Sequence, residues 1–339
     1  MRNAILILIL GLSISASSQD LHYSQYYSAP LQISPAHTGF FNGKYRIGAN
    51  YKYQWPFGID QNFATFNTYG AYADFAILDN KINNTDWMGL GVMFSRDAAG
   101  DGQLSTTKIG FSTAYHKGLD RLNRTMFSVG VSLNYVIRDI NFDRLFFNNQ
   151  WNDRDFDLNI DNLEPFNNES HSHLDFAAGI NLRLNPVEAW KISLGTSMHH
   201  INKPKDSFLG SNNRIDFRYI VNGYVDVALN ERLELSNSAY YTFQRGAQEG
   251  MFGSLLRIGF KGNDRSAGFV GMHYRFGDAL VPVVGVETNG LRLLVNYDVN
   301  TSNLAGVSNG NGGLEISLVK VGDWTGKNEL GRKLYCPRF

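Results

Sequence analysis

Four histidines come closest to a metal-binding pattern in this chain. His171 and His173 are two positions apart, and His199 directly precedes His200. Residues two apart on a β-strand share a face, whereas adjacent residues point to opposite faces. One regular strand could therefore direct His171 and His173, but not His199 and His200, at one ion. No cysteine or paired carboxylate stands at zinc-ligand spacing beside them, so we expect loop or aqueous-face histidines and no metal site.

The segment 97–102, Asp-Ala-Ala-Gly-Asp-Gly, faintly resembles a calcium-binding loop. A calcium loop of the helical type needs alternating oxygen ligands and a distal bidentate glutamate, and neither is present here. Aspartate and glycine are also the residues that favour tight turns. We interpret the segment as a hairpin turn.

A serine nucleophile with a histidine base would indicate hydrolysis. The nearest approach is Ser193, Ser197 and His199, which fall on the same face of one expected strand. Alternating serines are equally typical of a polar strand face, and no phosphate-binding glycine loop or basic stripe accompanies them. A membrane-embedded hydrolase is therefore kept only as a minor alternative.

The element that would position these residues is a long alternating strand. In segment 127–137 every second residue is large and apolar, and those between are mostly small or polar. One face of such a strand is apolar and the other is polar. About eleven residues is the length that a tilted strand needs to cross a bilayer. Because lipid cannot hydrogen-bond to exposed backbone groups, strands cross it only as a closed barrel.

Similar segments recur throughout the chain, and their even number, about fourteen, is typical of bacterial outer-membrane barrels. Soluble sandwiches or propellers are disfavoured because their strands average only about 5–6 residues. No segment shows a sustained helical period. The predicted strands span 45–54, 63–77, 86–97, 104–118, 124–138, 171–185, 189–201, 215–229, 232–244, 250–261, 266–275, 278–287, 290–299 and 312–320.

Charges inside the strands indicate which face is enclosed. A lysine or arginine at the lipid-facing midplane costs roughly 2–4 kcal/mol. We therefore expect Arg183, Arg257, Arg275 and Arg292 to face the lumen or to lie near an interface.

The chain ends predict export. Residues 1–18 combine Arg2, an apolar core and small residues before Gln19, which is the pattern of a cleaved signal peptide. The only cysteine is Cys336, so no intrachain disulfide can form. Residues 321–339 follow the last predicted strand and are expected to form a periplasmic tail.

The composition agrees with a barrel. Lys plus Arg and Asp plus Glu both number 31, so the net charge is zero, which argues against a nucleic-acid-binding role. The mean hydropathy of −0.25 is too low for helical membrane spans, but it suits a barrel with a polar lumen and polar loops.

Connection lengths predict the orientation. If the N-terminus starts in the periplasm, the periplasmic turns are mostly short, whereas the long loops 139–170, 202–214 and 300–311 lie outside. Residues 19–44 precede the first strand and contain Pro30 and Pro35. We expect them to form a non-strand plug or docking segment.

Several motifs resemble the PorP/SprF family of type IX secretion outer-membrane proteins. They include the mature start at 19–39, the stretch Asn-Tyr-Lys-Tyr-Gln-Trp-Pro at 50–56, the turn at 97–102, and the segments 194–204, 274–279, 297–302 and 336–339. The likeness covers essentially the whole mature chain. It departs at Leu21 and Ser34, where the family usually has proline and asparagine.

The resemblance implies an integral outer-membrane barrel of a Gram-negative bacterium, without enzymatic activity or cofactor. It implies that the protein supports export or surface anchoring of secreted proteins such as gliding adhesins. The partners would be periplasmic-ring or peptidoglycan-associated machine subunits, or one dedicated adhesin. A solute channel is the main alternative. The expected partner-docking residues are Tyr23, Ser24, Gln25, Tyr26, Pro30, Pro35, Gln54, Trp55 and Pro56.

Overall fold

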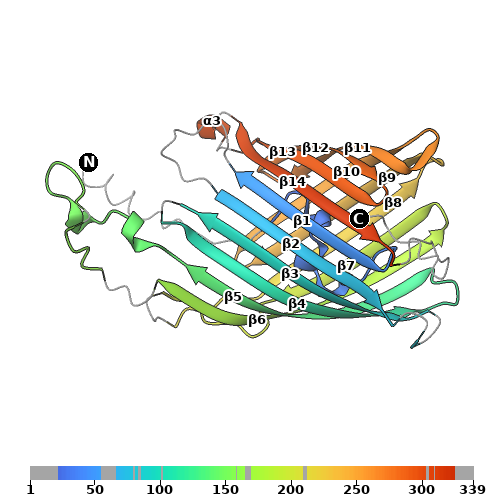
Figure 1. Cartoon of the computed structure of the whole chain (residues 1–339), viewed down its shortest axis with the longest axis horizontal. Helices are drawn as coiled ribbons and strands as arrows, with labels where there is room; N and C mark the ends of the chain where they lie inside the picture. The colour runs from blue at the N-terminus through green and yellow to red at the C-terminus, as the bar shows by residue number, and fades with distance from the viewer. Residues whose placement is uncertain are drawn as a thin grey trace, which may run out of the picture.

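The computed structural model describes residues 22–54, 66–78, 81–82, 85–100, 102–157, 159–164, 169–208, 212–302, 305–308 and 310–324. Within them, fourteen antiparallel strands form one closed barrel (Figure 1). Each strand pairs with its neighbours in sequence, and β1 closes the ring by pairing with β14. The strands are β1 (Tyr45–Gln54), β2 (Phe66–Ile77), β3 (Trp87–Ala99), β4 (Leu104–Gly118), β5 (Thr125–Asp139), β6 (Ser170–Val187), β7 (Trp190–His199), β8 (Arg218–Ala228), β9 (Leu233–Gln244), β10 (Ala247–Phe260), β11 (Asn263–Arg275), β12 (Ala279–Thr288), β13 (Leu291–Asn300) and β14 (Asn311–Gly322).

The barrel predicted from alternation is confirmed strand by strand, with small differences at the ends. The boundary at residue 320 was wrong, because β14 continues to Gly322, which pairs with Tyr45. The part of segment 63–77 before Phe66, and all residues after Trp324 including Cys336, lie outside the described residues. The signal-peptide prediction also falls outside them.

The two strand faces are divided as the sequence pattern predicts. On β5, Val129, Val131 and Leu133 project outward, with Val131 52% exposed, whereas Ser128 and Asn134 are buried inside. Outward apolar residues recur on every part of the ring. An outer surface of this kind suits lipid, and it leaves the polar residues to line the lumen.

All four strand arginines predicted to avoid lipid lie on the inner side. Arg183, Arg275 and Arg292 are buried, and the Arg257 side chain is only 12% exposed. Their position is confirmed. Among the described residues, no helix is long and apolar enough to span a membrane.

The two ends of the barrel differ in their connections. At one end, the turn end, the chain passes from each even-numbered strand to the next odd-numbered one, mostly through short turns. At the other, the loop end, lie the long connections 140–169, 200–217 and 301–310, the last containing α3 (Ala305–Ser308). The predicted hairpin turn at 97–102 is confirmed, because β3 ends at Ala99 and β4 starts at Leu104.

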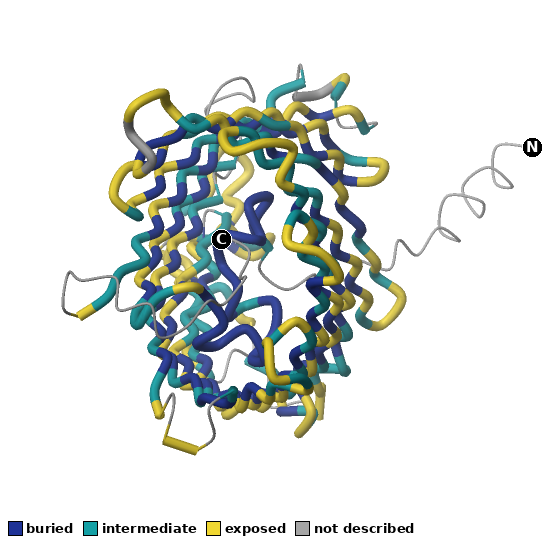
Figure 2. The backbone as a smooth tube through the Cα atoms, turned by 90° about the vertical axis from the view of Figure 1, so that its right-hand side faces the viewer, coloured by how far each residue is buried: buried dark blue, intermediate teal, exposed yellow. Residues whose placement is uncertain are grey.

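Residues 22–44, here called the lumen segment, lie inside the ring of strands (Figure 2). They form three short helical turns: η1 (Tyr26–Ser28), α2 (Pro30–Ile33) and η2 (Pro35–His37). Pro30 and Pro35 each start a turn, where a proline lacks only an N–H that would be unpaired in any case. The segment is therefore helical and irregular rather than a strand, as its prolines predict.

Candidate functional site

The lumen segment contains most of the residues expected to contact a partner. Gln54 ends β1 at the loop end, whereas Trp55 and Pro56 lie outside the described residues. The other six are buried against the inner barrel wall: Tyr23, Ser24, Gln25, Tyr26, Pro30 and Pro35. In this conformation their contacts are with the barrel itself.

Glu315 of β14 holds the start of the segment. Its two carboxylate oxygens accept the backbone N–H groups of Ser24 and Gln25, each at 2.8 Å. The Glu315 side chain is fully buried. A buried carboxylate is costly unless its oxygens are hydrogen-bonded, and here the segment supplies two donors.

A buried ion pair extends this contact. Arg275 of β11 lies 2.8 Å from the Asp298 carboxylate of β13, and the Ser24 hydroxyl donates to the same carboxylate at 2.7 Å. Arg275 also donates to the Ser24 hydroxyl oxygen. The Ser24 side chain thus completes an ion pair between two strands, and Glu315, Asp298 and Arg275 together are called the Glu315 anchor.

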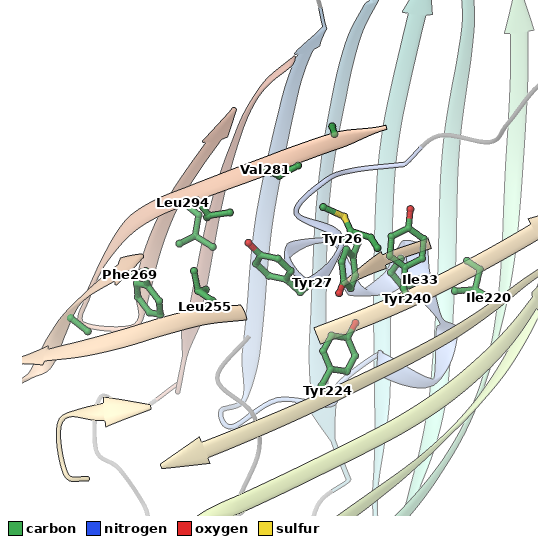
Figure 3. Packing of buried hydrophobic residues seen from close by; sticks show 14 residues of the cluster. Tyr26, Tyr27, Ile33, Ile220, Tyr224, Tyr240, Leu255, Phe269, Val281 and Leu294 are labelled. Carbon is green, nitrogen blue, oxygen red and sulfur yellow. The ribbon is translucent and has the colours of Figure 1, made fainter. Parts of the chain in front are cut away.

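Two tyrosines of the segment pack beside this anchor. The Tyr26 ring lies 4.6 Å from Tyr240 between centroids, and the Tyr27 ring stacks on His273 at 5.2 Å. Figure 3 shows them, with Ile33, among apolar side chains of the wall. Buried aromatic surface of this size is a major source of packing free energy. The labelled wall residues are Ile220, Tyr224, Tyr240, Leu255, Phe269, Val281 and Leu294.

Two of the three residues considered for hydrolysis, Ser197 and His199, bind the middle of the segment. Ser197 donates to the Ile33 carbonyl at 2.6 Å, and the His199 Nε2 lies 3.3 Å from the same oxygen. Ser193 instead donates to Asn181 at 2.8 Å. The three share a face, as predicted, but the Ser197 hydroxyl is committed to a backbone carbonyl rather than to a substrate.

Asp74 of β2 holds the end of the segment. It accepts the Gly39 N–H at 2.7 Å and pairs with Arg46 of β1 through both oxygens, at 2.7 and 3.0 Å. Arg46 also donates to the His37 carbonyl at 3.1 Å, and the Trp87 indole donates to the Gly39 carbonyl at 3.0 Å. Asp74, Arg46 and Trp87 are together called the Asp74 anchor. They form hydrogen bonds with backbone groups that a short irregular segment cannot pair internally.

His37 is enclosed between this anchor and the wall. Burial, together with the positive charge of Arg46, lowers the pKa of His37 to about 4. The imidazole is therefore neutral at physiological pH. A protonated His37 would place a second buried cation beside Arg46.

Glycines on the inner wall leave room for the segment. A Cβ atom on Gly89 would lie 1.9 Å from the Thr38 carbonyl oxygen, and one on Gly130 would lie 2.4 Å from the Pro35 backbone. Such distances are far below van der Waals contact. The segment backbone and the wall are complementary in shape at these positions, which alternation alone does not reveal.

His199 and His200 differ from the expectation that they point to opposite faces. Both are buried, and the His200 Nδ1 lies 3.0 Å from the Asp175 carboxylate. The reason is that β7 ends at His199, and His200 adopts a left-handed backbone with φ of 59°. The alternation rule holds only within the strand.

The connection 140–169 carries an exposed aromatic cluster at the loop end. Phe156 lies between Phe146 and Trp151, with ring centroids 5.2 and 5.1 Å away, and all three are exposed. We call them the aromatic patch. The connection also has seven acidic residues against two basic ones. In Figure 1 its helical turns η3 (Phe142–Arg144) and η4 (Asn148–Gln150) project beyond the strand ends.

The sequence did not identify the wall residues of the two anchors as a site. Glu315 and Asp74 do show a signal, because each is a charge inside an apolar strand and must face the lumen. Their partners in the lumen segment could not be found this way, since a strand pattern specifies a face but not what occupies the space beside it.

Comparisons with known proteins agree with this architecture. The Ralstonia pickettii toluene transporter TbuX has a TM-score of 0.53 and 11% identity, covering 86% of this chain and 92% of TbuX. The Pseudomonas putida toluene transporter TodX has a TM-score of 0.49 and 10% identity, covering 86% and 92%. At these identities the likeness to TbuX indicates the barrel fold alone.

None of the curated proteins compared matches the sequence. A model of the family described as type IX secretion system membrane protein PorP/SprF matches residues 15–319. Together with the closed barrel and its apolar outer face, this match makes the protein an outer-membrane component of type IX secretion. The chain belongs to the PorP/SprF family.

Proposed function

We propose that this protein is a non-enzymatic, closed barrel that holds an exported protein at the cell surface through its loop end. Two features together carry the proposal. Residues 22–44 occupy the lumen, and the exposed aromatic patch lies outside it at the loop end. The occupied lumen favours a scaffold over a solute channel, because the segment lies in the path a solute would take.

The short turns at the opposite end support an orientation with the loop end outside the cell. We therefore assign the aromatic patch to exported cargo rather than to a periplasmic machine subunit. Exposed aromatic residues are typical energetic centres of protein interfaces. The acidic surroundings favour a partner with a basic rim around an apolar contact.

The six buried docking candidates take a different role in this proposal. They hold the lumen segment inside the barrel and so keep the lumen blocked: Tyr23, Ser24, Gln25, Tyr26, Pro30 and Pro35. Contact with the partner is assigned to the aromatic patch and to the other expected docking residues, Gln54, Trp55 and Pro56. Lumen closure and surface docking are thus separable functions of different segments.

The test replaces Phe146, Trp151 and Phe156 with serine in cells that carry no other copy of the gene. Exported proteins should then move from the cell surface to the medium, while the barrel stays inserted. Leu163→Ser is the matched control, because Leu163 is an exposed apolar residue of the same connection outside the patch. Unchanged surface retention in the triple variant would contradict the docking role.

A planar-bilayer recording separates the two functional classes. We expect no steady conductance from the purified wild-type protein. A permanently open pore would instead support the solute channel.

A further inference from the structure

Two histidines and an aspartate converge at the loop end, away from the lumen segment. His171 and His173 lie on one face of β6, with ring centroids 5.7 Å apart, and Asp206 comes from the connection 200–217. One possible ligand atom from each of the three residues lies within 4.8 Å of the others. Four-coordinate zinc places its nitrogen and oxygen ligands about 3.3 Å apart, so small side-chain rotations would close the site.

The hydrogen bond of His171 indicates its tautomer. Its Nε2 lies 2.7 Å from the backbone carbonyl of Lys205, which can only accept a hydrogen bond. Nε2 therefore carries the proton, and Nδ1 keeps its lone pair. Metal-ligating histidines are commonly oriented by such a bond from the other ring nitrogen.

The other two residues also offer uncommitted electron pairs. Among the described residues, neither the buried Nδ1 of His173 nor the buried Oδ1 of Asp206 has a hydrogen-bond partner. The second oxygen of Asp206 pairs with Arg138, which orients the carboxylate. Buried polar atoms are rarely left unpaired without a reason.

We propose that His171, His173 and Asp206 bind one divalent transition-metal ion of the zinc class, with water completing the coordination. Two imidazoles with one carboxylate suit ions of borderline softness, whereas calcium and magnesium prefer oxygen ligands alone. The ion clamps the connection 200–217 to the end of β6. The sequence did not predict the site because the third ligand comes from the next connection and lacks any local spacing signal.

The test uses tag-free protein, purified in detergent and treated with a chelator. Zinc titration by calorimetry should give one site per barrel, and cobalt should give the visible absorption of a low-coordinate complex. His173→Asn and Asp206→Asn should each weaken binding about tenfold or more. His22→Asn is the matched control, because His22 also lies beside a carboxylate, that of Glu249 at 3.3 Å. This variant should bind zinc as wild type does, because His22 is not one of the three proposed ligands.

A second measurement follows the connection directly. Lys205 and Arg214 are trypsin sites within it. Zinc should slow their cleavage in wild type but not in His173→Asn, with heat-modifiable migration confirming a folded barrel in both. The proposal is overturned if wild type binds no zinc, if both ligand variants bind it as tightly as wild type, or if zinc leaves cleavage unchanged.

Discussion

Removal of the Glu315 carboxylate is expected to release the lumen segment. The carboxylate accepts two buried backbone N–H groups, from Ser24 and Gln25, each at 2.8 Å. Glu315→Ala leaves both donors unpaired, whereas Glu315→Gln keeps one acceptor oxygen. We call a barrel closed here when the lumen segment is bound inside it, and open when the segment is released. Both variants should destabilise the closed state, Glu315→Ala more than Glu315→Gln.

The magnitude follows from the number of bonds lost. A hydrogen bond to a charged acceptor contributes about 1.5–3 kcal/mol, so the alanine variant loses about 3–6 kcal/mol of segment binding. That corresponds to a rise of roughly 10²–10⁴-fold in the ratio of open to closed barrels. The glutamine variant loses about half of this free energy and should show a rise of roughly 10–10²-fold.

Single-barrel recordings in planar bilayers measure that ratio as the fraction of time spent open. Glu234→Ala is the matched control, because it removes a carboxylate that pairs with Lys191 at 3.4 Å and is not among the contacts of the lumen segment. Its open fraction should stay at the wild-type level. The reasoning is refuted if folded Glu315→Ala opens no more often than Glu234→Ala.

Three further changes test the wall around the segment. Gly89→Ala should increase opening and protease access to the segment, because the new Cβ would meet the Thr38 carbonyl oxygen at 1.9 Å; Gly268→Ala, where the nearest atom is 3.6 Å away, should not. Because the pKa of buried His37 is lowered to about 4, segment binding is strongest above pH 6.5 and should weaken by up to about 3 kcal/mol as the pH falls to 4. His37→Gln should flatten this pH dependence of the open fraction, and an unchanged profile would exclude His37 as its source. Arg46→Met should cost about 3–5 kcal/mol by leaving a buried carboxylate without its cation, measured as a lower midpoint of heat-induced unfolding; a midpoint equal to wild type would contradict this assignment.

Much of the fold was predictable because a strand has a period of two. The sequence from Phe127 to Ile137 indicates which side chains face lipid, and β5 places Val131 outward and Ser128 inward accordingly. The rule failed at His200, where the strand ends and the backbone turns left-handed. Side-chain alternation is a property of extended backbone and carries no information beyond it.

The proposed metal ligands also show that local sequence patterns do not reveal contacts between distant residues. The sequence showed that His171 and His173 share a face. The expectation that no carboxylate would join them considered only residues close to them in the sequence. Asp206 reaches the pair only after an intervening hairpin has brought the next connection to the same barrel end.

The sequence by itself determined that the chain forms a barrel, which face meets lipid and that residues 22–44 form no strand, because these follow from local periodicity and from proline. Only the tertiary structure decided where that segment goes. Ser24 meets Glu315 across 291 positions, and its place between Asp298 and Arg275 exists only once β11, β12 and β13 have paired. Ring closure creates the enclosed, low-dielectric space in which those charges need partners, and the lumen segment supplies them.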